Sequence, residues 1–128
     1  MFAGLNLPSE DLSDYRQYGF STSFCASISY LYNLSKKAVY GTRLWSVDKL
    51  KGNARTIFRE SLPFVLEKGV NQIYQRALPT APIIEEYKKN GFMQMEQSEI
   101  DRFYRDIFPQ IERRDDGIHM CKELAPRR

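Results

Sequence analysis

The sequence predicts an α/β domain of the α+β kind, in which a mixed, mostly antiparallel twisted sheet is flanked by helices. Residues 24–32 alternate apolar and aromatic side chains with Cys, Ser and Leu at a period of two, which indicates a strand. The apolar residues between positions 57 and 66 recur at helical spacing instead. The chain has 128 residues, 42% of them hydrophobic, and this length suits a single domain with one core.

Residues 1–48 are predicted to form a short helix and a β-hairpin. A capping Ser precedes two carboxylates within the segment that begins at Pro8, and Gly19 follows as a stop signal. The strand at residues 24–32 is joined by a polar connection to a second strand at residues 38–47. Because the connection is short, we expect the two strands to be antiparallel neighbours.

An amphipathic helix is predicted next, ending at Gly69. Its apolar side chains fall on one face: Ile57, Phe58, Leu62, Val65 and Leu66. Pro63 lies inside this pattern, and a proline there removes a backbone hydrogen bond and clashes with the preceding turn. Either the helix kinks at Pro63, or two shorter helices meet there with Ser61 as the cap of the second.

A strand at residues 70–78 and a second helix are predicted to follow. This helix opens at residues 80–82 and runs through Tyr87, with basic side chains in its last turn. Asn90 and Gly91 supply the left-handed residue that commonly ends a helix. Another strand begins at residue 92.

The C-terminal part, residues 97–128, is predicted to contain a helix and a last strand. The helix covers residues 98–107, with Ser98 as its cap. A turn at residues 115–117 leads into a strand at residues 118–124. If this final strand is exposed, its free edge could pair with a second copy of the chain to form a homodimer.

The composition argues against a nucleic-acid or membrane-spanning protein. The 19 Lys and Arg residues are interspersed with 16 Asp and Glu residues, and the net charge is only +3. A nucleic-acid-binding module normally gathers its basic residues on one face. No apolar run approaches the roughly 18 residues of a membrane span, and the N-terminus lacks the pattern of a secretory signal.

The cysteines and the histidine do not form a metal-binding motif. Cys25 and Cys121 lie far apart without a Cys-x-x-Cys spacing, and His119 is the only histidine. We interpret both cysteines as buried thiols rather than a disulfide, which favours a reducing, cytoplasmic location. A lone histidine on a last strand favours a structural role over a catalytic one.

A loop of small residues before the first long helix suits an anion. Gly52 permits a positive φ angle, Asn53 follows it, and Ala54 allows a phosphate to approach the backbone closely. The unpaired N–H groups of such a loop and the helix dipole both favour negative charge. Arg55 follows directly.

Three segments together carry a family resemblance. Residues 47–54 are similar to a strand that ends at a coenzyme pyrophosphate loop. Residues 84–92, which read Ile-Glu-Glu-Tyr-Lys-Lys-Asn-Gly-Phe, are similar to a recurrent helix ending of the same family, and residues 117–124 to its closing strand. With this spacing, residues 45–95 resemble the coenzyme-binding half of the GNAT superfamily of N-acetyltransferases, so residues 49–96 form an acyl-CoA-binding-like core.

The resemblance implies direct transfer of an acyl group from acetyl-CoA or another acyl-CoA to an amine, without a covalent enzyme intermediate. The residues that would bind the pyrophosphate are Lys51, Gly52, Asn53, Ala54 and Arg55. Tyr87 matches the position of a tyrosine that protonates the departing CoA thiolate. No general base is identified, and the amine acceptor is unknown.

Two other hypotheses remain at the level of sequence. The compact chain also resembles acetyltransferase-like proteins of short-tailed bacteriophages, which would place it in the host cytoplasm or the virion. A GNAT-like protein of that kind could act by contact with a protein partner rather than by catalysis, and aromatic residues, 13% of the chain, suit a contact surface. A helical assembly subunit would be the interpretation if residues 24–47 were helical.

Overall fold

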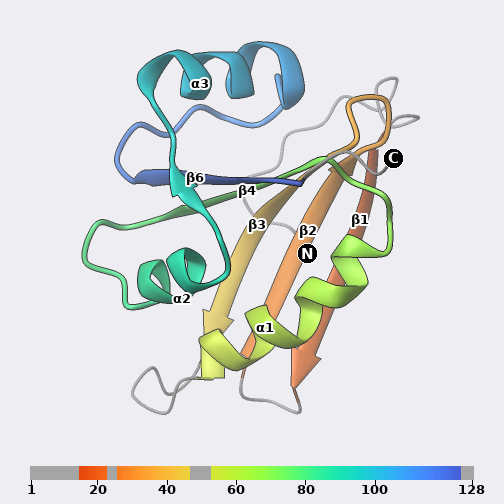
Figure 1. Ribbon diagram of the computed structural model, residues 1–128, viewed down its shortest axis with the longest axis vertical. Coiled ribbons are helices and arrows are strands. Elements are labelled where there is room, and N and C mark those ends of the chain that lie inside the picture. Colours follow the sequence, from red (N-terminus) through yellow and green to blue (C-terminus); the bar gives the residue numbers. More distant parts are fainter. Residues whose placement is uncertain (1–14, 23–25, 47–52, 125–128) are drawn as a thin grey trace.

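The computed structural model describes residues 15–22, 26–46 and 53–124 of the chain. Three strands come first and are followed by helices and strands in turn, which matches the mixed fold class predicted from the sequence (Figure 1). The elements are β1 (Tyr15–Thr22), β2 (Ala26–Asn33), β3 (Ala38–Ser46), α1 (Asn53–Leu66), β4 (Gln72–Ala77), α2 (Ile83–Lys89), β5 (Met93–Gln94), α3 (Gln97–Arg102), the π-helical turn η3 (Phe103–Ile107) and β6 (Ile118–Glu123).

The described strands form one six-stranded sheet in the order β1-β2-β3-β4-β6-β5. All neighbours are antiparallel except β3 and β4, which α1 connects as a parallel pair. The hairpin predicted for residues 24–47 is confirmed as β2 and β3, paired from Ala26 with Ser46 to Asn33 with Ala38. These strands also exclude the helical assembly subunit as an interpretation of this segment.

The helix predicted near the N-terminus is wrong where the structure describes it. Tyr15 to Thr22 form β1, which pairs with β2 along its whole length, and Gly19 lies inside this strand. The capping residues from Ser9 to Asp11 lie outside the described residues. The segment from Tyr15 onward is rich in Tyr, Phe and Thr, which favour strands. It also pairs with the edge of β2 that β3 leaves open, and so gains a ladder of hydrogen bonds.

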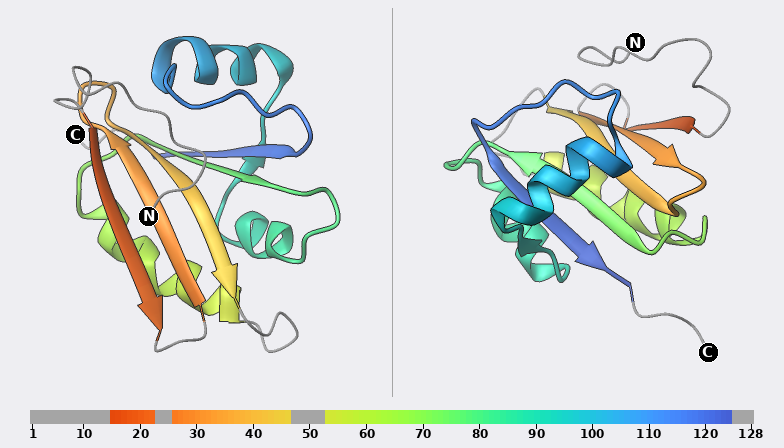
Figure 2. Two further views of the ribbon diagram at one scale, coloured as in Figure 1. Left: turned by 180° about the vertical axis from the view of Figure 1, so that it is seen from behind. Right: turned by 90° about the horizontal axis from the view of Figure 1, so that it is seen from above.

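The sheet has a helical layer on each face (Figure 2). Successive residues of a strand point to opposite faces, so Tyr30 packs with α1 and α2 while Leu31 packs with α3 and η3. We call these the α1/α2 face and the α3 face. Buried side chains on the α1/α2 face include Ile28, Tyr30, Val39, Phe58, Ile73, Tyr87, Phe92 and Met120, and those on the α3 face include Leu31, Tyr40, Tyr74, Phe103, Phe108 and Cys121.

Helix α1 runs through Pro63 as one helix, so neither the two shorter helices nor the Ser61 cap is found. Pro63 is exposed and lies three residues before the end of α1, so its ring disturbs little beyond the last turn. Ser61 is buried within the helix instead. Its hydroxyl donates to the carbonyl of Phe58 at 3.0 Å and lies 2.8 Å from the hydroxyl of Tyr30, which ties α1 to β2.

The next helix of the α1/α2 face, α2, ends as the sequence predicts. Gly91 has a φ angle of +88°, and its N–H donates to the carbonyl of Lys88. The chain can therefore turn sharply from α2 into β5. Phe92 follows the turn and is buried against α1 and α2.

The predicted helix at residues 98–107 is confirmed in position but has a different cap. Glu96 is the N-cap, and its side chain and that of Glu99 form a reciprocal capping box, so Ser98 is not the cap. The helix changes to π-helical geometry in η3, where the N–H of Phe108 donates to the carbonyl of Phe103 at 2.8 Å. None of the described helices is long and apolar enough to span a membrane.

Strand β6 lies inside the sheet, so the condition under which the last strand could pair with a second copy is not met. One side of β6 pairs with β4 from Ile118 to Glu123, and the other pairs with β5 at Met120 and Cys121. The edges of the described sheet are β1 and β5. The homodimer expected from a free edge of the last strand therefore has no support from its position.

Candidate functional site

Strands β3 and β4 pair over only part of their length. The parallel ladder joins Ala38 with Gln72, Val39 with Ile73 and Tyr40 with Tyr74, and it ends there. Beyond this point β3 continues to Ser46 and β4 to Ala77, and the two strands diverge (Figure 1). Beyond Tyr40 and Tyr74, the backbone N–H and C=O groups on the facing edges of β3 and β4 therefore do not pair with each other.

A β-bulge in β3 lies at the start of the divergence. Tyr30 of β2 pairs with Gly41, but the preceding Ser29 pairs with Arg43, so Thr42 is the extra residue. The Thr42 hydroxyl donates to the carbonyl of Ser29 at 3.2 Å. A bulge bends its strand and increases its twist, so this one helps to turn β3 away from β4.

A pocket of about 320 Å³ occupies the divergence. This is within the size range of small-molecule sites. Two arginines, and no Asp or Glu, are among the described residues that line it. The lining residues are Tyr40, Gly41, Thr42, Arg43, Leu44, Gln75, Arg76, Ala77, Leu78, Ala81, Ile83 and Tyr87.

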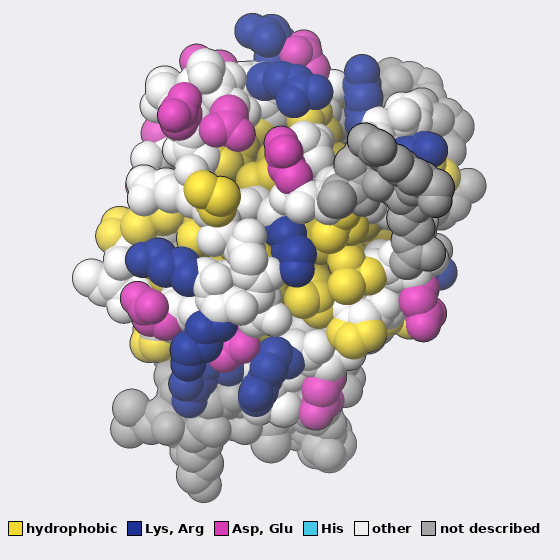
Figure 3. All heavy atoms as spheres, in the orientation of Figure 1, with side chains coloured by type: hydrophobic (Ala, Val, Ile, Leu, Met, Phe, Trp, Pro, Cys, Tyr) yellow, Lys and Arg dark blue, Asp and Glu magenta, His cyan; other side chains and the backbone are white. Residues whose placement is uncertain are grey.

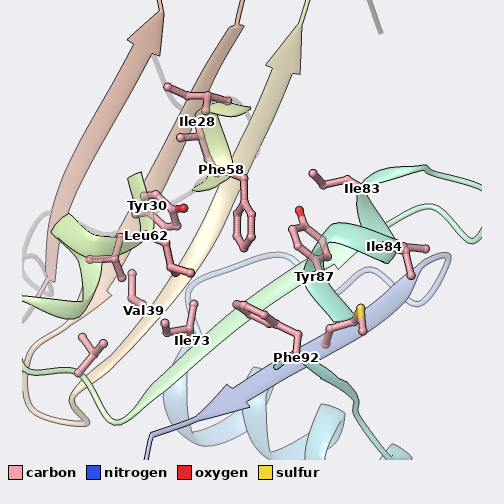
Figure 4. Close-up of a cluster of buried hydrophobic side chains, with 14 of the residues drawn as sticks. Ile28, Tyr30, Val39, Phe58, Leu62, Ile73, Ile83, Ile84, Tyr87 and Phe92 are labelled. Carbon is pink, nitrogen blue, oxygen red and sulfur yellow. The ribbon is translucent and has the colours of Figure 1, made fainter. Parts of the chain in front are cut away.

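Tyr87, the predicted catalytic residue, lies in the wall of this pocket. Its side chain extends from α2 toward α1 (Figure 4), and its ring centroid lies 4.9 Å from that of Phe58 and 5.6 Å from that of Phe92. The side chain is 1% exposed, and burial raises the pKa of its hydroxyl far above the usual value. The hydroxyl therefore stays protonated at neutral pH, and it donates to Oε1 of Gln75 at 3.4 Å.

The predicted pyrophosphate loop is described only in part. Lys51 and Gly52 lie outside the described residues, whereas Asn53, Ala54 and Arg55 are the first three residues of α1. Their N–H groups are among those that have no acceptor inside an α-helix. Figure 1 shows the start of α1 close to the end of β3, on the same face as α2.

Of the lining residues, only Tyr87 was predicted as a site residue, and those missed include Gly41, Arg43, Gln75 and Arg76. A glycine inside a strand pattern signals a bulge or a close approach of another group, and Gly41 gave that signal. Gln75 gave none, because its alternation with Tyr74 and Arg76 is that of an ordinary half-buried strand. It is nevertheless only 3% exposed.

His119 and Cys121 have structural surroundings on the α3 face. The Nε2 atom of His119 lies 2.8 Å from the hydroxyl of Tyr104, and burial is the main cause that lowers the pKa of the imidazole. Cys121 is a free, buried thiol, and burial raises its pKa to about 12, whereas Cys25 lies outside the described residues. Within the described segments, no three His, Cys, Asp or Glu side chains gather as metal ligands do.

Comparison with solved structures identifies the fold. An acetyltransferase from Bacillus cereus superposes with a TM-score of 0.61 at 15% identity, covering 92% of this chain and 80% of that one. GCN5 from Tetrahymena gives 0.60 at 13% identity, covering 90% and 71%. The PaiA N-acetyltransferase of Thermoplasma acidophilum, solved in complex with coenzyme A, gives 0.55 at 16% identity, covering 91% and 65%.

No protein-family model matches the sequence, and no curated protein sequence matches it. The structural matches show that the chain has the GNAT fold, as the resemblance of residues 45–95 implied. They give no support to the narrower resemblance to bacteriophage proteins. At this level of identity the matches describe the fold alone.

Proposed function

We propose that this protein is an N-acyltransferase of the GNAT type, which transfers an acyl group from acyl-CoA to an amine in the pocket between β3 and β4. One observation carries the proposal. A pocket of about 320 Å³ opens where the two parallel strands separate, and Tyr87 lies in its wall. Matches of the whole fold to acetyltransferases, one of them solved with coenzyme A, support it.

The start of α1 suits the pyrophosphate of the coenzyme. Backbone N–H groups of Gly52, Asn53, Ala54 and Arg55 would donate to its oxygens, and Lys51 would add a positive charge. The first turn of α1 contains no acidic residue that would oppose an anion. Arg55, Arg59, Lys88 and Lys89 are exposed on α1 and α2, and Figure 3 shows Lys and Arg side chains gathered on the lower part of this face.

The diverging strands suit the arm of the coenzyme. The arm contains two amide groups, and the facing edges of β3 and β4 offer backbone N–H and C=O groups that the opposite strand does not use. An extended ligand between them would satisfy these groups as an added strand does. This arrangement would bring the thioester at the tip of the arm to Tyr87.

In the proposed reaction the amine nitrogen attacks the thioester carbonyl carbon. A carbon–nitrogen bond forms, the carbon–sulfur bond breaks, and the sulfur leaves with the electron pair of that bond. Tyr87 donates a hydrogen bond to the sulfur and supplies its proton, so CoA leaves as the thiol. Because no carboxylate or imidazole is among the described lining residues, water accepts the proton that the amine releases and returns one to Tyr87.

A thermal unfolding experiment with acetyl-CoA tests the proposal. A ligand present at 100 times its dissociation constant adds about 2.7 kcal/mol to the free energy of unfolding. For a domain of this size we expect the melting temperature to rise by roughly 10 °C. ADP at the same concentration serves as the control for the nucleotide part of the coenzyme.

An unchanged melting temperature with acetyl-CoA, free CoA and longer acyl-CoAs would remove the basis for acyl transfer. The remaining hypothesis would then be a GNAT-like protein that acts by contact with a protein partner. Location in the cytoplasm or in a virion stays a prediction from the sequence.

A further inference from the structure

An unused hydrogen-bond donor lies where β3 and β4 separate. The Nε2 atom of Gln75 is buried and has no hydrogen-bond partner within the described part of the chain. A buried donor without an acceptor costs free energy, so such groups are rare and call for an explanation. Because Gln75 lines the pocket, a ligand bound there can supply the acceptor.

Gly41 determines where the amide of Gln75 lies. Gly41 and Gln75 are the first residues beyond the last parallel pair, Tyr40 with Tyr74. A methyl group at position 41 would overlap Oε1, Nε2 and Cδ of Gln75. The amide of Gln75 therefore rests against the backbone of Gly41 and reaches from β4 to β3, across the start of the divergence.

Tyr87 binds the oxygen of the Gln75 amide. Its hydroxyl donates to Oε1 of Gln75 at 3.4 Å, so the carbonyl half of the side chain is turned toward Tyr87. The nitrogen half can only donate. A partner of Nε2 must therefore carry a free lone pair, so neither an ammonium group nor a metal cation can be that partner.

We propose that Nε2 of Gln75 binds the carbonyl oxygen of the acyl thioester. The inference rests on the proposed function, in which the sulfur of that thioester lies at Tyr87. The oxygen and the sulfur are attached to the same carbon atom, and Gln75 and Tyr87 are in direct contact, so the two side chains match the two atoms. The oxygen becomes more negative as the amine attacks, which strengthens the hydrogen bond in the transition state.

Binding of two coenzyme derivatives tests this role. Acetyl-CoA carries the carbonyl, whereas S-ethyl-CoA is a thioether with a CH₂ group in its place. By titration calorimetry we expect wild-type protein to bind acetyl-CoA about 3- to 10-fold more tightly than the thioether, as one buried hydrogen bond provides. Gln75→Met keeps the length of the side chain and removes the donor, so it should abolish this preference.

Gln94→Met is the matched control, because Gln94 is exposed on β5 and should leave the preference intact. Gly41→Ala is a second variant, in which the new methyl group displaces the amide, and it should show the same loss as Gln75→Met. If both variants fail to fold, the wild-type protein still tests the proposal, because equal affinities for the two compounds overturn it.

Failure of the proposed function and failure of the role of Gln75 give different results in this experiment. If the wild-type protein binds neither compound, the proposed function fails and this inference fails with it. If it binds both with equal affinity, the carbonyl oxygen is not the partner of Nε2, and only the role of Gln75 is wrong. A preference for acetyl-CoA that persists in Gln75→Met would assign the carbonyl to another donor and also overturn the role of Gln75.

Discussion

Tyr87 combines a protonated hydroxyl with a position in the wall of the pocket. We expect Tyr87→Phe to lower kcat about 100-fold, because the departing sulfur loses its proton donor, while KM for acetyl-CoA stays within about twofold. The release of CoA thiol is measured with a thiol-reactive dye and a panel of amines. The panel includes amines that carry a carboxylate, which Arg43 in the pocket wall would attract, whereas Arg76 already pairs with Asp116 at 3.3 Å.

Tyr30→Phe is the control for this variant. Tyr30 is also a buried tyrosine of the α1/α2 face, but its hydroxyl contacts Ser61 rather than the pocket. It should keep the turnover of the wild-type protein. Equal turnover of Tyr87→Phe and wild type would show that Tyr87 packs the core without acting as the acid.

His119 makes stability depend on pH. In the folded protein, burial and the nearby charges of Arg76 and Arg113 lower the pKa of the His119 imidazole, although the charge of Asp115 opposes them. The unfolded chain, with a histidine pKa of about 6.5, therefore binds more protons than the folded chain just below that pH. The stabilisation is complete above about pH 6.5 and is lost as the pH falls.

Urea unfolding at pH 5.5 and 7.5 measures this effect. The free energy of unfolding of the wild-type protein should fall toward pH 5.5, and His119→Gln should show a smaller decrease. Because Asp and Glu residues titrate equally in both proteins, the difference between the two decreases reports on His119. Parallel decreases in the two proteins would contradict the lowered pKa.

Sequence patterns could indicate Tyr87 and the loop near Ala54, because both lie in local motifs next to helix ends. They could not indicate Gln75. Its burial depends on where β3 and β4 separate. These two strands are far apart in the sequence, with α1 and its loops between them. A polar residue on a strand has the same local pattern whether its face meets water or closes a pocket.

At the scale of elements, α1 tolerates a proline at some cost. Pro63 cannot donate to the carbonyl four residues earlier, and its ring crowds the preceding turn. We expect Pro63→Ala to raise the free energy of unfolding by about 1 to 3 kcal/mol, measured by urea unfolding. Because Pro63 is exposed, the new side chain leaves the core unchanged. A lower stability of the variant would mean that the proline ring itself stabilises the last turn.

Helix ends and the alternation of strands were predictable because they depend on neighbouring residues. Asn90 and Gly91 ended α2 as expected, and β2 and β4 lie where the alternation of residues indicated strands. Strands β3 and β6 lie where the hairpin connection and the turn at residues 115–117 indicated them. Strand β1 was not predictable, because the edge of β2 decides its conformation. The place of β6 between β4 and β5 was not predictable either, since strand order depends on contacts between distant parts of the chain.

At the scale of the whole molecule, the parallel crossover between two antiparallel sections creates the site. Antiparallel pairing holds β3 to β2 and β4 to β6, while β3 and β4 share only three register pairs. The sheet can therefore open between β3 and β4 while each of these strands stays hydrogen-bonded to its antiparallel neighbour. The same crossover carries α1, whose first turn follows the end of β3.

Nuclear magnetic resonance of the backbone amides during a titration with acetyl-CoA tests this arrangement most directly. A chain of 15.0 kDa is well suited to the method. We predict that the largest shifts occur in residues 41–44 of β3, residues 75–77 of β4 and the first turn of α1, with small shifts in β1 and α3. Shifts confined to other elements, or no shifts at saturating acetyl-CoA, would contradict an acyl-CoA site between β3 and β4.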